Sequence, residues 1–270
     1  MSAPIGVGPI RVGIGGWSFE PWRGTFYPDK LPHKRELAYV GERLTATEIN
    51  ATYHRLQKPE SFANWAAAVP DGFVFAVKGS RYVTNRRVLA EAGESVGKFL
   101  DQGIVELGDK LGPILWQFMA TKKFEADDFA AFLALLPPSR AGVKLRHVIQ
   151  VRHESFACPE FIALMRKAGL PICYADSAGY PAIADITGDF VYARLENAQE
   201  SAAAGYAPEA LDGWAEAARN WAAGGAPAGL PYVDASAPPK QARETFVFMI
   251  NGFKPKAPAA ALALLERLRA

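Results

Sequence analysis

Short runs of apolar residues recur along the chain, and stretches with helical periodicity separate them. Each run spans four to six residues and is rich in β-branched and aromatic side chains, which is typical of strands buried on both faces. The runs predict strands at residues 10–15, 45–50, 73–78, 113–118, 147–152, 172–175, 190–195 and 245–250.

The stretches between these runs predict helices at 34–43, 59–68, 87–111, 126–135, 159–168, 208–222 and 258–269. Several begin with proline, which the first helical turn tolerates because that N–H has no partner within the helix. Strands that alternate with helices over short connections indicate a parallel sheet. Eight such strands in 270 residues predict an α/β protein with a closed (β/α)8 TIM barrel. We expect a single domain over 1–270, with the barrel at 9–269.

Two segments depart from this alternation. Residues 16–32 interleave aromatic side chains with glycine and proline, and we expect them to lie over the C-terminal face of the barrel. They are interpreted either as a hydrophobic cluster that plugs the barrel top or as a lid that stacks on a sugar or base. Residues 223–243 are rich in Ala, Gly and Pro and are predicted to form a long loop.

Composition narrows the class of protein. Lys and Arg number 30 and Asp and Glu number 28, so the formal net charge of +2 argues against a dedicated electrostatic binder of bulk nucleic acid. Two cysteines, Cys158 and Cys173, are too few for a disulfide scaffold. The N-terminus lacks the pattern of a secretion signal, and no apolar run reaches the roughly 18 residues that cross a bilayer. We therefore expect a cytoplasmic protein that does not enter a membrane.

Polar residues gather where the predicted strands end, which is where TIM barrels place their chemistry. They are Glu48, Asn50, Lys78, Arg81, Gln117, Gln150, Arg152, His153, Asp176, Arg194, Glu196 and Asn251. Burying Lys78, Arg152 and Arg194 near one point costs several kcal/mol for each unpaired ion, so an anion is expected to face them. Arginine suits this task because its planar fork binds phosphate or carboxylate through two hydrogen bonds. A polar cluster that satisfies itself is the structural alternative.

Most of these residues, and three aromatic residues near them, have a predicted role. Glu48 is the expected general acid/base, and Asp176 is expected to orient a cation or to share a proton. Lys78, Arg152 and Arg194 are expected to hold the anion. Further contacts with the substrate are predicted for Trp17, Tyr27, Asn50, Tyr53, Arg81, Gln117, His153 and Asn251.

Motifs for cofactors and metals are incomplete. The Gly13-Ile14-Gly15-Gly16 turn has Ser18 where a dinucleotide loop needs its third glycine, and the chain has no phosphate-binding P-loop. With only four histidines, the remaining metal hypothesis is one divalent ion held by Glu48, His153 and Asp176. We expect neither a cofactor nor a metal.

Several motifs follow one another at the strand ends. They are GGWS (15–18), WRGTFYP (22–28), EINATY (48–53), FVFAVK (73–78) with Arg81 and Thr84, LGPILWQF (111–118), VRHESF (151–156), Asp176, YARL (192–195), Asn251 and AP (257–258). In this order they resemble the domain-of-unknown-function family 72, also called YecE-like, from about residue 11 to residue 268.

The resemblance implies a TIM barrel similar to those of xylose isomerase and endonuclease IV, with a suggested role in handling nucleic acid or phosphate. This sequence departs from the family pattern at three positions. Gln150 replaces a usual glutamate, Asn85 a common histidine, and Glu196 the first residue of a His-Gly pair. The loss of one acid and two histidines argues against metal-dependent chemistry.

Three hypotheses follow for the function. The first is a metal-independent enzyme that acts on a small anionic substrate, such as a phosphorylated sugar or nucleotide. The second is a module that binds single-stranded or damaged nucleic acid, with bases stacked on the aromatic residues and an affinity that falls steeply with salt. The third is a glycoside hydrolase that uses two carboxylates such as Glu48 and Glu196, which must lie roughly 5 to 9.5 Å apart.

Overall fold

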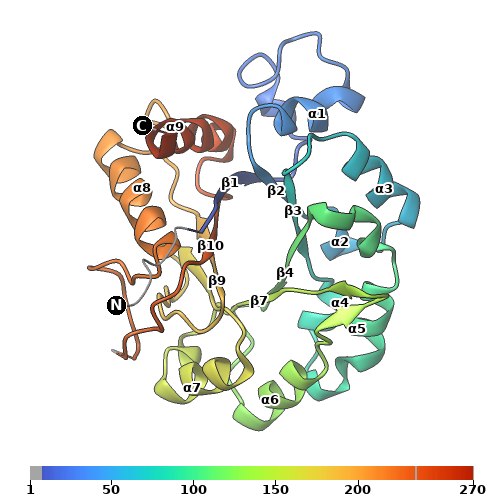
Figure 1. The fold of residues 1–270 in the computed structure, drawn as a ribbon, viewed down its shortest axis with the longest axis vertical. Coiled ribbons are helices and arrows are strands. Elements are labelled where there is room, and N and C mark those ends of the chain that lie inside the picture. The colour runs from blue at the N-terminus through green and yellow to red at the C-terminus, as the bar shows by residue number, and fades with distance from the viewer. Residues whose placement is uncertain (1–7, 235, 270) are drawn as a thin grey trace, which may run out of the picture.

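Eight parallel strands form the centre of the fold in a computed structural model that describes residues 8–234 and 236–269 (Figure 1). They are β1 (Ile10–Gly15), β2 (Ala46–Ile49), β3 (Val74–Lys78), β4 (Leu111–Gln117), β7 (His147–Gln150), β8 (Cys173–Asp176), β9 (Phe190–Leu195) and β10 (Glu244–Met249). Their order in the sheet is β7-β4-β3-β2-β1-β10-β9-β8. The predicted strands and the (β/α)8 fold are confirmed. Of the predicted domain 1–270, residues 1–7, 235 and 270 lie outside the described residues.

Strand pairing is sparse where the barrel closes, between β7 and β8. One isolated bridge joins Ile149 to Ile172, and the Ile149 N–H donates to the Pro171 carbonyl over 3.0 Å. By contrast, β1 and β10 pair continuously over five residues. We call the β7–β8 join the seam.

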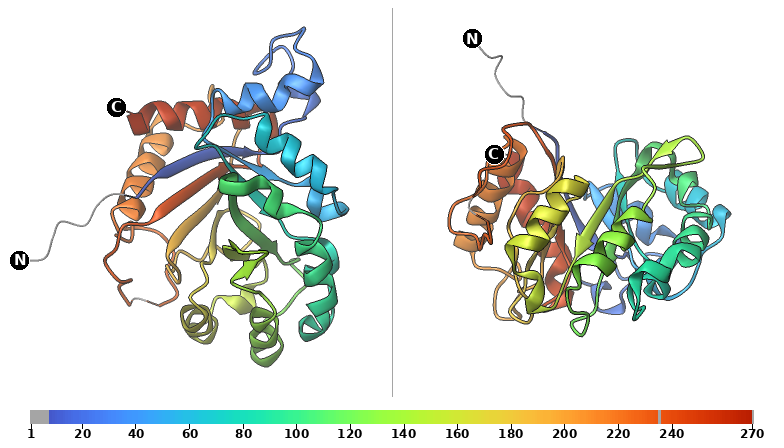
Figure 2. Two further views of the ribbon diagram at one scale, coloured as in Figure 1. Left: turned by 45° about the vertical axis from the view of Figure 1, so that its right-hand side comes forward. Right: turned by 90° about the horizontal axis from the view of Figure 1, so that it is seen from below.

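Helices surround the strands on the outside of the barrel (Figure 2). They are α1 (Glu36–Gly41), α3 (Pro59–Ala67), α5 (Gly93–Leu100), α6 (Ala126–Ala134), α7 (Pro159–Ala168), α8 (Pro208–Ala222) and α9 (Ala257–Arg269). Proline occupies the first turn of α3, α7 and α8, as the sequence predicted. Two short helices, α2 (Ala51–His54) and α4 (Arg81–Thr84), were not predicted and follow directly after β2 and β3. None of the helices described is long and apolar enough to cross a membrane.

The single helix predicted over 87–111 is wrong. The segment forms a 3-10 turn (Leu89–Ala92), helix α5 and a second 3-10 stretch (Ile104–Lys110). Gly103 lies three residues after the end of α5 and directly before the second 3-10 stretch, and its φ of 102° favours glycine and does not continue a helix. The periodicity of the apolar residues continues across this break, which is why the pattern alone predicted one helix.

The interior of the barrel combines large aromatic side chains on one side with small residues on the other. Phe246 and Phe248 of β10 lie nearly parallel, and Tyr192 of β9 packs against Phe248 with ring centroids 5.0 Å apart. A Cβ added to Gly13 would lie 2.3 Å from the Ala46 carbonyl oxygen and 2.9 Å from the Phe248 ring. Gly13 and Ala46 therefore leave the space that the β10 aromatics fill. This apolar layer forms the floor beneath the polar ends of the strands.

Residues 16–32 pack as a hydrophobic cluster at the rim, beside α1 (Figure 1). The aromatic cluster consists of Phe19, Trp22, Phe26, Tyr27 and Tyr39, with rings mostly edge to face. Trp22 is buried, and its indole N–H donates to the Lys254 carbonyl over 3.1 Å. Trp17 lies outside this cluster, against Trp65 and Phe75. The other irregular segment, at 223–234 and 236–243, contains neither helix nor strand, as predicted.

Candidate functional site

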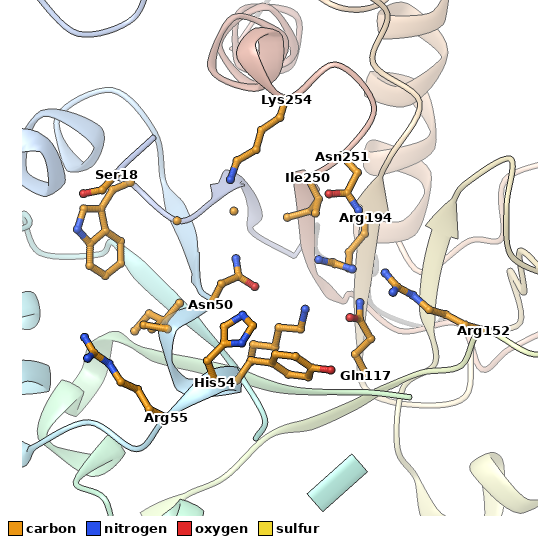
Figure 3. Close-up of a pocket in the computed structure, with 17 residues that line it drawn as sticks. Ser18, Asn50, His54, Arg55, Gln117, Arg152, Arg194, Ile250, Asn251 and Lys254 are labelled. Carbon is orange, nitrogen blue, oxygen red and sulfur yellow. The ribbon is translucent and has the colours of Figure 1, made fainter. Parts of the chain in front are cut away.

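A cavity of about 710 Å³ opens at the C-terminal ends of the strands (Figure 3). Its volume lies within the range of roughly 300–1,000 Å³ that is usual for small-molecule sites. Of the residues predicted to form the site, the structure brings these to the cavity wall: Trp17, Asn50, Tyr53, Lys78, Gln117, Arg152, Arg194 and Asn251. We call this space the mouth cavity.

The charges that line the mouth cavity are positive. Lys78, Arg152 and Arg194 reach the wall as predicted, and Arg55 and Lys254 join them. Figure 3 shows Lys254 approaching from the side of α9 while Arg152, Arg194 and Gln117 approach from across the opening. Among the residues described, no aspartate or glutamate lines the cavity. The site therefore presents cations and neutral amides to a ligand.

Arg194 connects this wall to the carboxylates beneath it. Its Nη1 donates to Glu196 Oε1 over 2.9 Å and to Gln150 Oε1 over 2.8 Å, and its Nη2 donates to Glu48 Oε1 over 3.1 Å. Burial alone would lower the pKa of the guanidinium, but Glu48 and Glu196 raise the pKa above its ordinary value. Arg194 therefore stays charged although only 2% of its surface is exposed.

Glu48 lies beneath the mouth cavity and is ionised. Its side chain is fully buried, and both of its oxygens accept hydrogen bonds, Oε1 from Arg194 and Oε2 from the Tyr192 hydroxyl over 2.7 Å. Burial would raise the pKa of this carboxyl, but Arg194 and Lys78 outweigh burial and hold the pKa below its usual range. This position suits a group that fixes Arg194 in place.

Gln150 of β7 connects β4 and β9 through its side chain. Its side-chain oxygen accepts from Arg194 and, over 2.6 Å, from Gln117 Nε2 of β4. Its Nε2 has no hydrogen-bond partner within residues 8–234 and 236–269. A neutral amide therefore stands where a carboxylate would have added another negative charge beside Arg194.

Lys78 ends β3 and points into the mouth cavity. Its ammonium lies 4.6 Å from the centre of the Tyr53 ring. Burial and the nearby Arg194, partly offset by Glu48, lower the pKa of Lys78 from 10.5 to about 8. A sizeable fraction of this amine is therefore neutral near physiological pH.

Arg152 forms the side of the mouth cavity next to β7. Its guanidinium lies 3.8 Å from Glu196 Oε1 and stacks over the Tyr180 ring at 4.4 Å. Its Nε lacks a hydrogen-bond partner among the described residues, and the same holds for the Nε of Arg194. Two guanidinium groups thus retain hydrogen-bonding capacity beside one cavity.

Besides Glu48, which lies beneath the cavity, four residues predicted for the site lie away from its wall: Asp176, Tyr27, Arg81 and His153. Asp176 accepts from the Asn197 amide over 2.9 Å, and burial raises its pKa. Tyr27 is buried in the aromatic cluster and donates to the Trp17 carbonyl over 2.5 Å. Arg81 begins α4 on the surface, and His153 Nδ1 accepts from the Ser155 N–H over 3.1 Å.

Several residues of the mouth cavity were not among the predicted substrate contacts: Ser18, His54, Arg55 and Lys254. His54 follows Tyr53, so its position directly after the second strand was the only available signal. Lys254 comes from the β10–α9 loop, and its ammonium lies 4.4 Å from the Phe19 ring. Burial lowers its pKa. Regarding metals, the described part of the chain contains no group of three or more His, Cys, Asp or Glu side chains arranged to hold an ion.

Comparison with known proteins identifies relatives of the whole chain. The family model described as "Protein of unknown function DUF72" matches residues 11–270. A DUF72 family protein from Thermotoga maritima superposes with a TM-score of 0.72 at 23% identity, covering 97% of this chain and all of that one. A DUF72 family protein from Enterococcus faecalis gives a TM-score of 0.70 at 17% identity, covering 97% and 96%.

The fold is also shared with a more distant barrel. A fusion protein of a xylose isomerase-like TIM barrel with 4-hydroxyphenylpyruvate dioxygenase gives a TM-score of 0.50 at 16% identity, covering 97% of this chain and 43% of that one. No protein with a curated function matches the sequence. These similarities concern the fold, so the chemistry has to be argued from the mouth cavity itself.

Proposed function

The chain belongs to the DUF72 family of TIM-barrel proteins, and from its mouth cavity we propose that it is an enzyme acting on a small anionic substrate that bears a phosphate or carboxylate group. The observation that carries this proposal is the sign of the charges at the wall. Arg55, Lys78, Arg152, Arg194 and Lys254 line the cavity, and the carboxylates that balance them lie underneath. A bound anion would complete the pairing of these cations, as buried charges require.

The arrangement suggests how the substrate is held. Arg152 and Arg194 supply the guanidinium donors, which bind a planar or tetrahedral anion in a defined orientation. Asn50, Gln117 and Asn251 offer neutral amides to the hydroxyl or carbonyl groups of the substrate. The proposed reaction requires no metal ion.

The carboxylates act indirectly in this proposal. Glu48 fixes Arg194 and keeps it charged, so we assign Glu48 a positioning role; the general acid/base role predicted from the sequence stays a prediction. The role predicted for Asp176 also stays a prediction. Its carboxylate accepts a hydrogen bond from Asn197 outside the cavity wall. The glycoside hydrolase hypothesis is not favoured, because Glu48 and Glu196 both accept hydrogen bonds from Arg194 beneath the cavity.

Matched pairs of charged and neutral ligands test the proposal. Melting temperatures are measured with glycerol 3-phosphate against glycerol, glucose 6-phosphate against glucose, and citrate. A ligand at about 100 times its Kd adds roughly 2.7 kcal/mol of stability, which gives a clear rise in Tm. We expect this rise with at least one anion and with neither of the neutral compounds.

Two variants separate the mouth cavity from the general surface. Arg152→Gln removes a cavity guanidinium and should weaken anion binding by about tenfold or more, or roughly 1.4 kcal/mol. Arg87→Gln removes an exposed arginine outside the cavity and should leave binding unchanged. A Tm that responds equally to charged and neutral ligands would refute the proposal. Binding confined to oligonucleotides, and lost with added salt, would favour the nucleic-acid hypothesis instead.

A further inference from the structure

We propose that Lys78 is a nucleophile that forms an imine with its substrate, so that the anionic substrate is also an aldehyde or a ketone. The inference rests on the proposed function and deepens it, because it adds a carbonyl carbon to the phosphate or carboxylate that the cavity binds. It would make Lys78 a catalytic residue in the strict sense, since its nitrogen would bond to the substrate.

The first argument is the freedom of the Lys78 amine. No described side chain forms a hydrogen bond with its Nζ, and no described carboxylate oxygen lies within the 4.0 Å of an ion pair. Other buried cations of this layer have such partners, and Arg194 contacts two carboxylates. The Lys78 ammonium instead faces the Tyr53 ring, whose centre lies 4.6 Å away. The amine therefore reaches the cavity without first breaking an ion pair.

The second argument is the rigidity of its attachment. Lys78 is the last residue of β3, and β3 pairs with β2 on one side and β4 on the other. The Thr52 hydroxyl donates to the Lys78 carbonyl over 2.6 Å, which ties the end of the strand to helix α2. A nucleophile held on a strand end is positioned more accurately than one on a mobile loop.

The third argument is the charge around the amine. Burial contributes most to lowering the pKa of Lys78. Arg194 and Arg152 lower it further, and Glu48 and Glu196 offset part of the effect. The resulting pKa of about 8 leaves about a tenth of the amine neutral at pH 7, compared with roughly 0.03% for an ordinary lysine. Burial beside other cations is an established way to activate a lysine nucleophile.

Lys254 is the other lysine of the mouth cavity and provides a comparison within the same site. Its ammonium lies over the Phe19 ring at 4.4 Å and within 5.7 Å of the Trp22 ring centre, at the rim. Burial alone lowers the pKa of Lys254, and the guanidinium groups of Arg152 and Arg194 do not contribute to this shift. We therefore assign imine formation to Lys78 and anion binding to Lys254.

The proposed step balances as follows. The neutral Lys78 amine adds its electron pair to the carbonyl carbon, and the oxygen takes up a proton to give a carbinolamine. Loss of the hydroxyl group as water, with one further proton from solvent and the release of an N–H proton, yields a protonated imine. The sum is one amine, one carbonyl and one proton giving one iminium ion and one water. The iminium carries the same charge as the lysine ammonium, so the Tyr53 ring and Glu48 stabilise it in the same way.

Reductive trapping tests the inference. The protein is incubated separately with dihydroxyacetone phosphate, glyceraldehyde 3-phosphate and pyruvate in the presence of cyanoborohydride, whose hydride reduces the C=N bond to a stable secondary amine. We expect one adduct per chain in the intact mass with at least one of these probes, and peptide mapping should locate it at Lys78. Inorganic phosphate should compete with the phosphate-bearing probes. The labelling rate should rise with pH around a midpoint of about 8.

Two conservative variants complete the design. Lys78→Arg retains the positive charge and cannot form an imine, so labelling should be lost while binding of inorganic phosphate, measured by calorimetry, persists. Lys98→Arg changes an exposed lysine of α5 that is paired with Glu94 and should label as the unaltered protein does. The pH profile of the unaltered protein provides an independent test if Lys78→Arg does not fold.

The outcomes separate the two proposals. Labelling at Lys254, labelling spread over surface lysines, or a midpoint near 10.5 would overturn the role of Lys78. Phosphate binding without any trapped adduct would overturn the imine and leave the proposed function intact. A protein that binds neither phosphate nor any of the anionic probes would overturn both.

Discussion

The guanidinium of Arg194 donates to the carboxylate of Glu48 over 3.1 Å at a depth where solvent reaches 2% of the arginine and none of the glutamate. Arg194 comes from β9 and Glu48 from β2, so the contact crosses the interior of the barrel. A buried charge without its partner is costly, which makes the two residues dependent on each other. The wall of the mouth cavity is therefore supported from below by charges that the ligand does not touch.

Replacing Glu48 should reduce the stability of the fold. In Glu48→Gln the amide cannot balance Arg194 and Lys78, and we expect a loss of about 3 kcal/mol in the free energy of unfolding at neutral pH. The folded-state pKa of Glu48 is depressed, so its contribution is present above its unfolded pKa and is lost as pH falls through the folded value. Urea unfolding between neutral and acidic pH should therefore show a smaller acid dependence in the variant. Glu94→Gln, at an exposed site, should unfold at the same urea concentration as the unaltered protein.

Lys78 should affect stability in alkaline solution. Its folded pKa of about 8 lies below the ordinary 10.5, so between these values the folded protein binds fewer protons than the unfolded chain. Raising the pH through this window therefore favours folding, by about 3 kcal/mol at its upper end. Relative to Lys78→Met, the unaltered protein should gain stability as pH rises from about 8 to about 10.5. Parallel pH profiles of unfolding in the two proteins would contradict the lowered pKa.

Gln150 should control the charge of the site. In Gln150→Glu the new carboxylate still accepts from Arg194 and Gln117, removes the unpartnered Nε2 and adds a negative charge beside the cations. We expect the affinity for inorganic phosphate to fall about tenfold, or roughly 1.4 kcal/mol, because the anion then competes with an internal carboxylate. Calorimetry measures this directly, with the exposed Gln241→Glu as its control. An unchanged affinity would show that phosphate does not bind near Arg194.

The aromatic cluster should make a large contribution to stability. Trp22 is fully buried, so Trp22→Ala is expected to cost about 3–5 kcal/mol through the cavity that it leaves. The half-buried Trp214 of α8 provides a comparison, and its replacement by alanine should cost less. Equal losses of unfolding free energy would mean that residues 16–32 do not hold the cluster together in solution.

The sequence predicted the strands well because each is a short apolar run that is buried on both faces. Glu48, Gln150 and Arg194 could be placed at the mouth because these residues lie on strands, where alternate side chains point to opposite faces. The same rule does not extend beyond the strand ends. Arg81 begins the short helix α4 and His153 directly precedes a 3-10 turn, so the local backbone path rather than a period of two sets the direction of each side chain.

The electrostatic arrangement of the site was harder to predict. The sequence placed carboxylates and cations together at the mouth, but it did not show that Glu48 and Glu196 lie in a layer beneath the cavity wall. That separation depends on how deeply each strand position sits in the barrel. Lys254 and Arg55 were missed because they reach the cavity from loops, where residue spacing carries no directional information.

The seam has a consequence for how the barrel opens. Because one bridge joins β7 and β8, the barrel behaves as a rolled sheet whose two edge strands meet at the seam. Thermal fluctuations should separate these two strands first. Gln150 lies on β7 at one margin of the sheet, and Arg194 lies on β9, the strand next to the other margin, so their hydrogen bond links the two sides of the seam. An anion held between Arg152 and Arg194 would fasten the same margins together. Ligand binding should then slow amide hydrogen exchange at Ile149 and Ile172. It should also reduce association between partly open molecules, because fewer strand edges are exposed.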